Sequence, residues 1–158
     1  MKLLDQVKNA NNKYAWPSLL FSVCMGMVTL IHHLHSAIFL HPDSGAMHIV
    51  YNEFVLIPAT IISMFVFLKN NNKIAFWIYI IIAVLGFIFL GLFEGGWNHT
   101  AKLIAYLRID SLFPQIGDIL PKDNWHYWFY ELSGVLTFMV TMIASYYTLR
   151  FFNSERNA

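Results

Sequence analysis

The stretch KIAFWIYIIIAVLGFIFLGLFEGGWNH, residues 73–99, decides the fold of this chain. No charged residue stands between Lys73 and Glu94. A run of this length can cross the bilayer core, about 30 Å thick, as a helix of about 20 residues. Glu94 and His99 follow where that helix would reach the lipid headgroups. The stretch therefore predicts a membrane-spanning helix that carries ionisable groups at one end.

Three more apolar segments flank this stretch, and the predicted helices cover residues 14–40, 47–68, 74–97 and 125–152. The chain is 58% hydrophobic and 12% charged, whereas a soluble domain is about 25% charged. We expect an all-α fold: an integral membrane four-helix bundle with up-down-up-down topology, in one domain over residues 1–158. Residues 100–124 would form an outer loop.

Charge and cysteine content exclude several classes of protein. The net charge of +1 supplies no basic field for nucleic acid, so we expect no nucleic-acid partner. Cys24 is the single cysteine, which excludes CxxC zinc and redox motifs. The lipid bilayer is the partner that the composition predicts.

Lysine and arginine placement predicts the orientation in the membrane. The basic residues that flank one end of the predicted helices are Lys2, Lys8, Lys13, Lys69, Lys73, Arg150 and Arg156. Cytoplasmic loops carry the excess of positive charge, so we expect both termini in the cytoplasm. The other end then faces outward from the plasma membrane, which we take to be the inner membrane of a bacterium.

Ionisable residues gather at that outer end. The candidate metal ligands are His35, His48, Glu53, Glu94, His99, His126 and Glu131, with His32 ranked after His35. Such groups are costly in lipid and usually serve a purpose there. His33 points nearly opposite to His35 on an ideal helix, so we expect it to contact a loop or a headgroup instead.

An internal repeat relates the two halves of the chain. His48-x-x-Tyr-x-Glu53 resembles His126-x-x-Phe-x-Glu131, and the His-Ser-Ala that begins at His35 resembles the His-Thr-Ala that begins at His99. Two helical hairpins repeated in parallel would account for this pattern. Each hairpin would supply one trio, namely His35, His48 and Glu53 or His99, His126 and Glu131. Two trios predict a binuclear site, with Glu94 as a bridge because it has no counterpart.

Helical geometry complicates that site. Glu94 and His99 are five residues apart, which is about 140° around an ideal α-helix, and the same holds within each His-to-Glu pair of the repeat. Both members could flank one inward face, or a π-helical segment could bring them together. Gly95 and Gly96 could loosen the helix between Glu94 and His99.

Imidazole and carboxylate ligands favour zinc or iron first and copper next. The leading interpretation is a metal-dependent membrane enzyme, a hydrolase or oxidoreductase acting on a lipid or another hydrophobic small molecule, with Glu94 as catalytic general base. The alternatives are metal-ion binding, transport or sensing, and haem ligation. A small subunit of a larger, redox-active membrane complex, a homo-oligomer, and a polar network facing an aqueous vestibule also stay open.

Overall fold

The computed structural model describes residues 13–40, 47–104 and 124–156, and their regular structure is helical throughout. The elements are α2 (Ala15–His35), η1 (Ser36–Leu40), α3 (Met47–Asn70), α4 (Lys73–Ile81), η2 (Ile82–Ile88), η3 (Gly91–Ala101) and α7 (Trp125–Arg156), where η marks a π-helix. Four continuous helices are long and apolar enough to cross a membrane: Ala15–Leu40, Met47–Asn70, Lys73–Ile104 and Trp125–Arg156. The prediction of an all-helical chain with four helices able to span a membrane is confirmed. The third helix runs on to Ile104, beyond its predicted end, and the rest of the expected outer loop lies outside the described residues.

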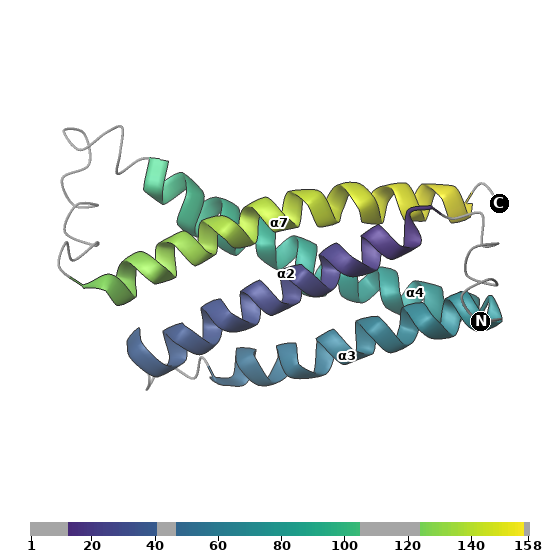
Figure 1. The fold of residues 1–158 in the computed structure, drawn as a ribbon, viewed down its shortest axis with the longest axis horizontal. Helices are drawn as coiled ribbons and strands as arrows, with labels where there is room; N and C mark the ends of the chain where they lie inside the picture. The colour runs from purple at the N-terminus through teal and green to yellow at the C-terminus, as the bar shows by residue number, and fades with distance from the viewer. Residues whose placement is uncertain (1–12, 41–46, 105–123, 157–158) are drawn as a thin grey trace.

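The helix α2 is central to the bundle. It lies between α3 and α7 in Figure 1 and packs against both, while α7 also packs against η3 and α3 packs against α4. One buried apolar cluster joins Ala15 at the start of α2, Phe67 near the end of α3, Ala75 in α4 and Phe151 near the end of α7. These four helix ends therefore share one end of the bundle. A second cluster, around Met25, fills the middle.

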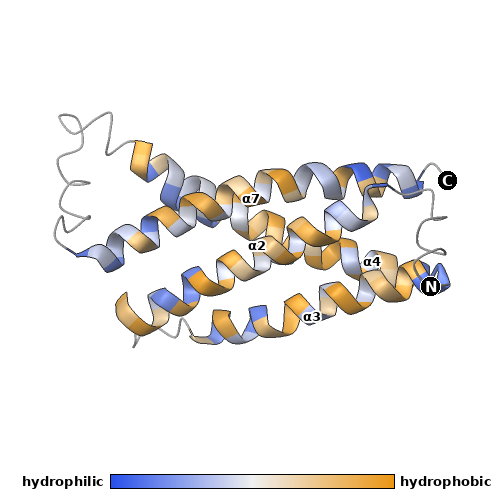
Figure 2. Ribbon diagram, in the orientation of Figure 1, coloured by the Kyte–Doolittle hydropathy of each residue, from blue (hydrophilic) through white to orange (hydrophobic). Residues whose placement is uncertain are grey.

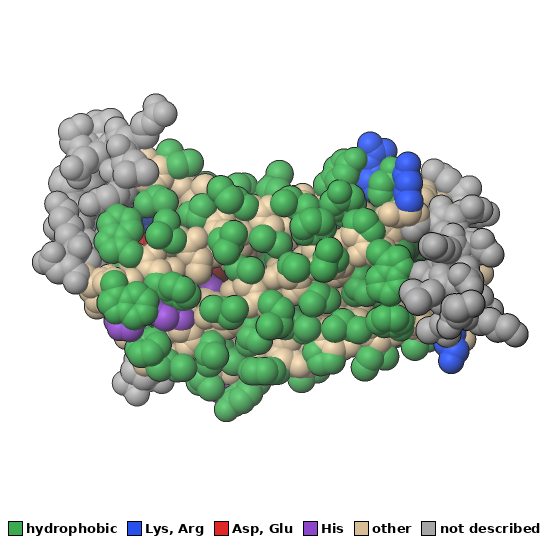
Figure 3. All heavy atoms as spheres, viewed as in Figure 1, with side chains coloured by type: hydrophobic (Ala, Val, Ile, Leu, Met, Phe, Trp, Pro, Cys, Tyr) green, Lys and Arg blue, Asp and Glu red, His purple; other side chains and the backbone are tan. Residues whose placement is uncertain are grey.

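The outer surface of the bundle is apolar. Val55, Leu85 and Leu149 are each at least 60% exposed, and Figure 2 shows hydrophobic residues along the middle of the helices with hydrophilic ones toward the ends. An apolar surface of this extent marks a membrane-facing protein. In Figure 3, histidine atoms reach the surface near one end, and Lys and Arg side chains stand at the other.

Glycines allow η3 to lie directly on α7. A Cβ atom added at Gly95 would come within 2.6 Å of the Phe138 backbone nitrogen and 2.7 Å of the Gly134 carbonyl oxygen. A Cβ atom at Gly134 would in turn collide with the imidazole of His99. Small residues of this kind let membrane helices approach at backbone distance. The close approach places His99 directly against α7.

Buried hydroxyl groups line the interior of α2 and α7. They include Ser18, Ser22, Thr29, Thr137, Thr141 and Thr148. Most of the threonines donate to a carbonyl one turn earlier, as Thr29 does to Met25 at 2.8 Å and Thr141 to Thr137 at 2.6 Å. Ser18 instead contacts the Tyr79 hydroxyl at 2.5 Å. Internal bonds of this kind satisfy polar groups that lipid could not.

Candidate metal centre

A π-helix brings Glu94 and His99 onto one face. Both lie in η3, where backbone bonds run from residue i to i+5, and the Thr100 hydroxyl likewise donates to the carbonyl of Gly95, five residues back, at 2.7 Å. The Nε2 atom of His99 is consequently 3.5 Å from Oε1 of Glu94. The predicted π-helical solution to the five-residue spacing is confirmed for this pair.

Three candidate ligands converge beside this face. His32 and His33 of α2 and Glu94 of η3 each offer one ligand atom, and these atoms lie within 4.8 Å of one another. We call them the ligand group. His99 stands next to it through its contact with Glu94. The distance from a zinc ion to an imidazole nitrogen or a carboxylate oxygen is about 2.0–2.2 Å. Small side-chain movements would therefore bring the three ligand atoms to bonding distance of one ion.

Each of the three histidines has its Nδ1 atom held by a partner on another helix. His33 Nδ1 lies 2.8 Å from Oε1 of Glu53, and His32 Nδ1 lies 2.9 Å from the Ser133 hydroxyl. His99 Nδ1 lies 2.9 Å from Oε2 of Glu131. Metal-binding histidines almost always engage their second nitrogen in this way, which sets the tautomer and the ring orientation. The arrangement leaves Nε2 of each ring for a ligand.

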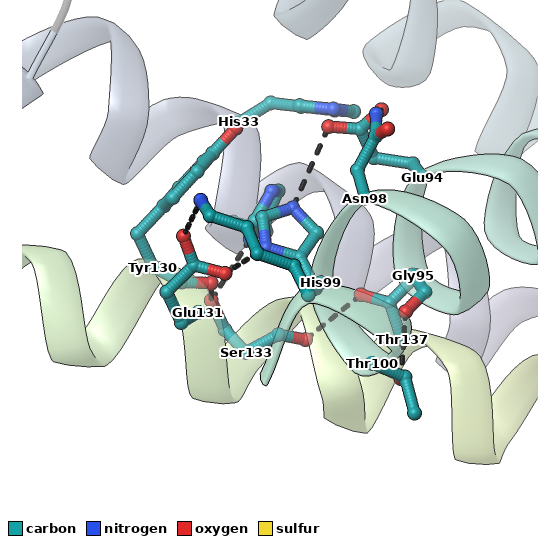
Figure 4. A network of polar contacts seen from close by, with 12 residues as sticks. His33, Glu94, Gly95, Asn98, His99, Thr100, Tyr130, Glu131, Ser133 and Thr137 are labelled. Atoms are coloured by element: carbon teal, nitrogen blue, oxygen red, sulfur yellow. Dashed lines mark hydrogen bonds and ion pairs between the residues drawn. The ribbon is translucent and has the colours of Figure 1, made fainter. Parts of the chain in front are cut away.

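The two carboxylates around His99 are themselves fixed. Lys102 Nζ donates to Glu131 at 2.5 Å, and the Asn98 amide donates to Glu94 at 2.8 Å. Figure 4 shows His99 between Glu131 of α7 and Glu94 of η3. The ring of Tyr130 stacks on His32 with centroids 4.3 Å apart and meets His99 edge-on at 4.7 Å. The rings and carboxylates of the centre therefore have little freedom to turn.

Buried polar atoms at the centre lack hydrogen bonds among the described residues. They are Nε2 of His32, Nε2 of His99 and Oε2 of Glu53. The 3.5 Å between His99 Nε2 and Glu94 is too long for a hydrogen bond. An unsatisfied buried group is costly and calls for an explanation such as a bound ion. Two of these atoms are imidazole nitrogens, one on His32 of the ligand group and one on His99 beside it.

The structure redistributes the residues of the two predicted trios. His48 is exposed on α3, while Glu53, five residues on, is buried against His33. His126 contacts His35, with Nδ1 and Nε2 3.1 Å apart, while Glu131 contacts His99. The reason is that α3 and α7 stay α-helical here, so a five-residue spacing leaves about 140° between the side chains. Neither trio is assembled among the described residues.

His33 is the member that sequence reasoning missed. It was expected to contact a loop or a headgroup, and that prediction is wrong because its side chain is only 12% exposed and faces Glu53 on α3. The signal was the pair His32–His33 itself. Neighbouring residues on a helix point about 100° apart, so one can face α7 while the other faces α3.

We compared the chain with known proteins. A scan against protein-family models, a search of curated proteins and a search of solved structures found no match.

Proposed function

We propose that this chain is an integral membrane metalloprotein that holds one divalent transition metal, zinc or iron before copper, at His32, His33 and Glu94. The convergence of these three side chains, with Nδ1 of both histidines held by a partner, is the observation that carries the proposal. Imidazole with carboxylate suits those metals. We propose one metal ion in place of the two expected from the sequence, because the described residues bring three ligands together at one place only.

The centre supports an enzyme best, and a hydrolase in particular. Three protein ligands with an open fourth position are typical of catalytic zinc sites, where the metal lowers the pKa of bound water. His99 Nε2 faces the ligand group, and Glu131 accepts a hydrogen bond from its Nδ1–H. A buried carboxylate on Nδ1 is the arrangement that makes Nε2 a general base. We therefore assign the ligand role to Glu94 and proton transfer to His99.

A hydrophobic substrate fits the surroundings of the centre. Between α2 and α7 lies a groove of about 390 Å³ within the membrane-spanning segments. It is lined by Val28, Ile31, Phe129, Leu132, Ser133 and Leu136. Ser133 is the polar residue of this lining, and its hydroxyl contacts His32. A lipid chain in this groove would lie one side chain away from the ligand group.

Metal transport is the second use that one observation favours, namely the buried hydroxyls of α2 and α7. Thr137 donates to the Ser133 carbonyl at 3.0 Å and Thr141 to the Thr137 carbonyl at 2.6 Å, which leaves their oxygen lone pairs for a cation. Against transport, the apolar cluster around Met25, Ile57 and Phe87 fills the bundle beyond the centre. That cluster is the reason to place an enzyme ahead of a transporter.

Elemental analysis of the protein, purified in mild detergent without chelator, tests the metal proposal. We expect one transition-metal ion per chain, because one ligand group is present among the described residues. Two ions per chain that both survive dialysis against a weak chelator would support the binuclear alternative. A preparation that contains no metal and binds none on dialysis against zinc would rule the proposal out and favour a polar network.

Glu53 provides a sharper test, because it holds His33 in the proposal but was a candidate ligand from the sequence. Glu53→Ala should weaken zinc affinity by about 10–100-fold, the usual effect of losing a partner of a ligating histidine. Glu53→Gln should lose far less, since its amide oxygen can still accept from His33 Nδ1–H. Competition with a chromophoric chelator measures both. Equal losses in the two variants would make Glu53 a ligand.

We also propose that the chain forms two up-down hairpins with the centre on the outer side of the membrane. Most basic residues lie at the end of the bundle opposite to Lys102 and the ligand group. These residues are Lys13, Lys69, Lys73, Arg150 and Arg156. In a Cys24→Ser background, Ile104→Cys should react with an impermeant maleimide on intact cells, because Ile104 is exposed at the outer end. The matched variant Asn70→Cys should react only after lysis. The reverse pattern would invert the topology.

A further inference from the structure

His35 and His126 form a second histidine pair outside the ligand group. Nε2 of His35 and Nδ1 of His126 form a hydrogen bond of 3.1 Å, which joins the end of α2 to the start of α7. His35 is 8% exposed and His126 is partly exposed. The rings of Phe39, Trp125 and Phe129 surround the pair. The proposed function leaves this pair without a role.

The spacing of the pair suits a metal ion. Two imidazole nitrogens bound to zinc at about 2.05 Å, with a tetrahedral angle between them, lie roughly 3.4 Å apart. The observed 3.1 Å is within a few tenths of an ångström of that value. The hydrogen bond holds the two nitrogens near the spacing that a metal needs, and an ion would replace its proton.

The pair lacks the support that the inner histidines have. Nδ1 of His35 is buried and has no hydrogen-bond partner among the described residues, whereas Nδ1 of His32 and of His33 each contacts a side chain. Without such a partner a histidine is a poorer ligand. Two protein ligands also hold an ion less firmly than three. A site of this kind would bind metal weakly and release it readily.

Position links the pair to the ligand group. His35 and His32 are three residues apart on α2, a spacing that places side chains on one helix face about 5–6 Å apart. Burial increases along this route, since His126 is partly exposed, His35 is 8% exposed and His32 is 1% exposed. An ion that arrives from outside would meet the pair before it reaches the ligand group.

We infer that His35 and His126 form a separate, weak transition-metal site that captures an incoming ion and passes it to His32, His33 and Glu94. The capture site itself stands on the geometry of the pair. Its role in delivery rests on the proposed function, so the two parts need separate experiments.

Binding at the capture site is tested with Co²⁺ in protein whose ligand group is removed by His32→Ala and Glu94→Ala. The centroid of the Trp125 ring lies 4.1 Å from that of His126, so bound Co²⁺ should quench the fluorescence of Trp125. The signal of Trp125 is obtained by subtracting that of the Trp125→Phe variant. We expect the Kd for Co²⁺, measured from this quenching, to rise at least tenfold when His126→Ala or His126→Gln is added. His48→Ala, an exposed histidine on α3, is the control and should change nothing. Quenching that is unaffected by both His126 variants would overturn the capture site, whatever the inner ligands do.

Delivery is tested by the rate at which metal-free protein takes up Co²⁺. With an intact ligand group, His126→Ala should slow uptake several-fold and leave the final metal content unchanged. An unchanged rate would refute delivery. A final content as low as that of His32→Ala would show that His126 belongs to the inner centre instead. Failure of the intact protein to bind any ion at the inner centre would refute the proposed function, while the fluorescence titration would still decide the capture site.

Discussion

His33→Ala is expected to abolish the proposed metal binding, although an ideal helix turns this residue away from His35. The ligand atoms of His33, His32 and Glu94 lie within 4.8 Å of one another, so each substitution to alanine deletes one of three ligands. A lost ligand should cost at least as much as a lost partner of a ligand, so we expect affinity to fall by more than about 100-fold. Metal per protein after dialysis against a weak chelator measures the effect.

His48→Ala is the matched control for that experiment. His48 was a candidate ligand from the sequence, yet it is exposed on α3. Its replacement should leave the metal content at the wild-type value. Equal loss in His33→Ala and His48→Ala would point to general destabilisation, and loss in His48→Ala alone would restore the trio arrangement expected from the repeat.

Gly95→Ala is expected to separate η3 from α7. In an open helix this change should stabilise by about 1 kcal/mol, because alanine is the better helix former. Here the new methyl group would lie 2.6 Å from the Phe138 backbone nitrogen and 2.7 Å from the Gly134 carbonyl oxygen. Neither atom can turn aside as a side chain can. Overpacking costs about 1–3 kcal/mol and occasionally more, so we expect net destabilisation together with loss of metal.

Thermal unfolding in detergent, combined with metal analysis, checks the Gly95 prediction. Gly86→Ala is the control, because its added methyl group would lie 3.3 Å from a terminal methyl of Leu56 and 3.5 Å from a side-chain carbon of Ile82. Those side chains can adjust, so Gly86→Ala should unfold at or above the wild-type temperature. A Gly95→Ala protein as stable as Gly86→Ala would show that η3 and α7 do not touch at backbone distance.

The membrane-spanning segments could be predicted because their signal is local. Apolar runs such as residues 73–93 are long enough to span a bilayer, and ionisable residues such as Glu94 mark their ends. The composition of the centre was also readable, since Glu94, His32 and His99 stood among the candidates. Each of these inferences needs only the residue type and its depth along one helix.

The partners within the centre could not be predicted, because they depend on how the helices rotate against one another. The His33–Glu53 contact requires knowing which face of α2 meets α3, and the His32–Ser133 contact requires the register of α2 on α7. The sequence offered a π-helix as one of two ways to bring side chains five residues apart together. The structure has a π-helix in η3, which contains Gly95 and Gly96. It has an α-helix at His48–Glu53 and at His126–Glu131.

The ligand group draws on two helices, with His32 and His33 from α2 and Glu94 from η3. An ion held there would cross-link the first and third membrane-spanning helices, both of which pack against α7. Binding to the folded state alone adds stability of about 2.7 kcal/mol when free metal is 100 times Kd. In a cell short of that metal, the added stability would be absent. The lifetime of the folded protein in its membrane would then follow the supply of its ion, so that abundance itself reports metal availability.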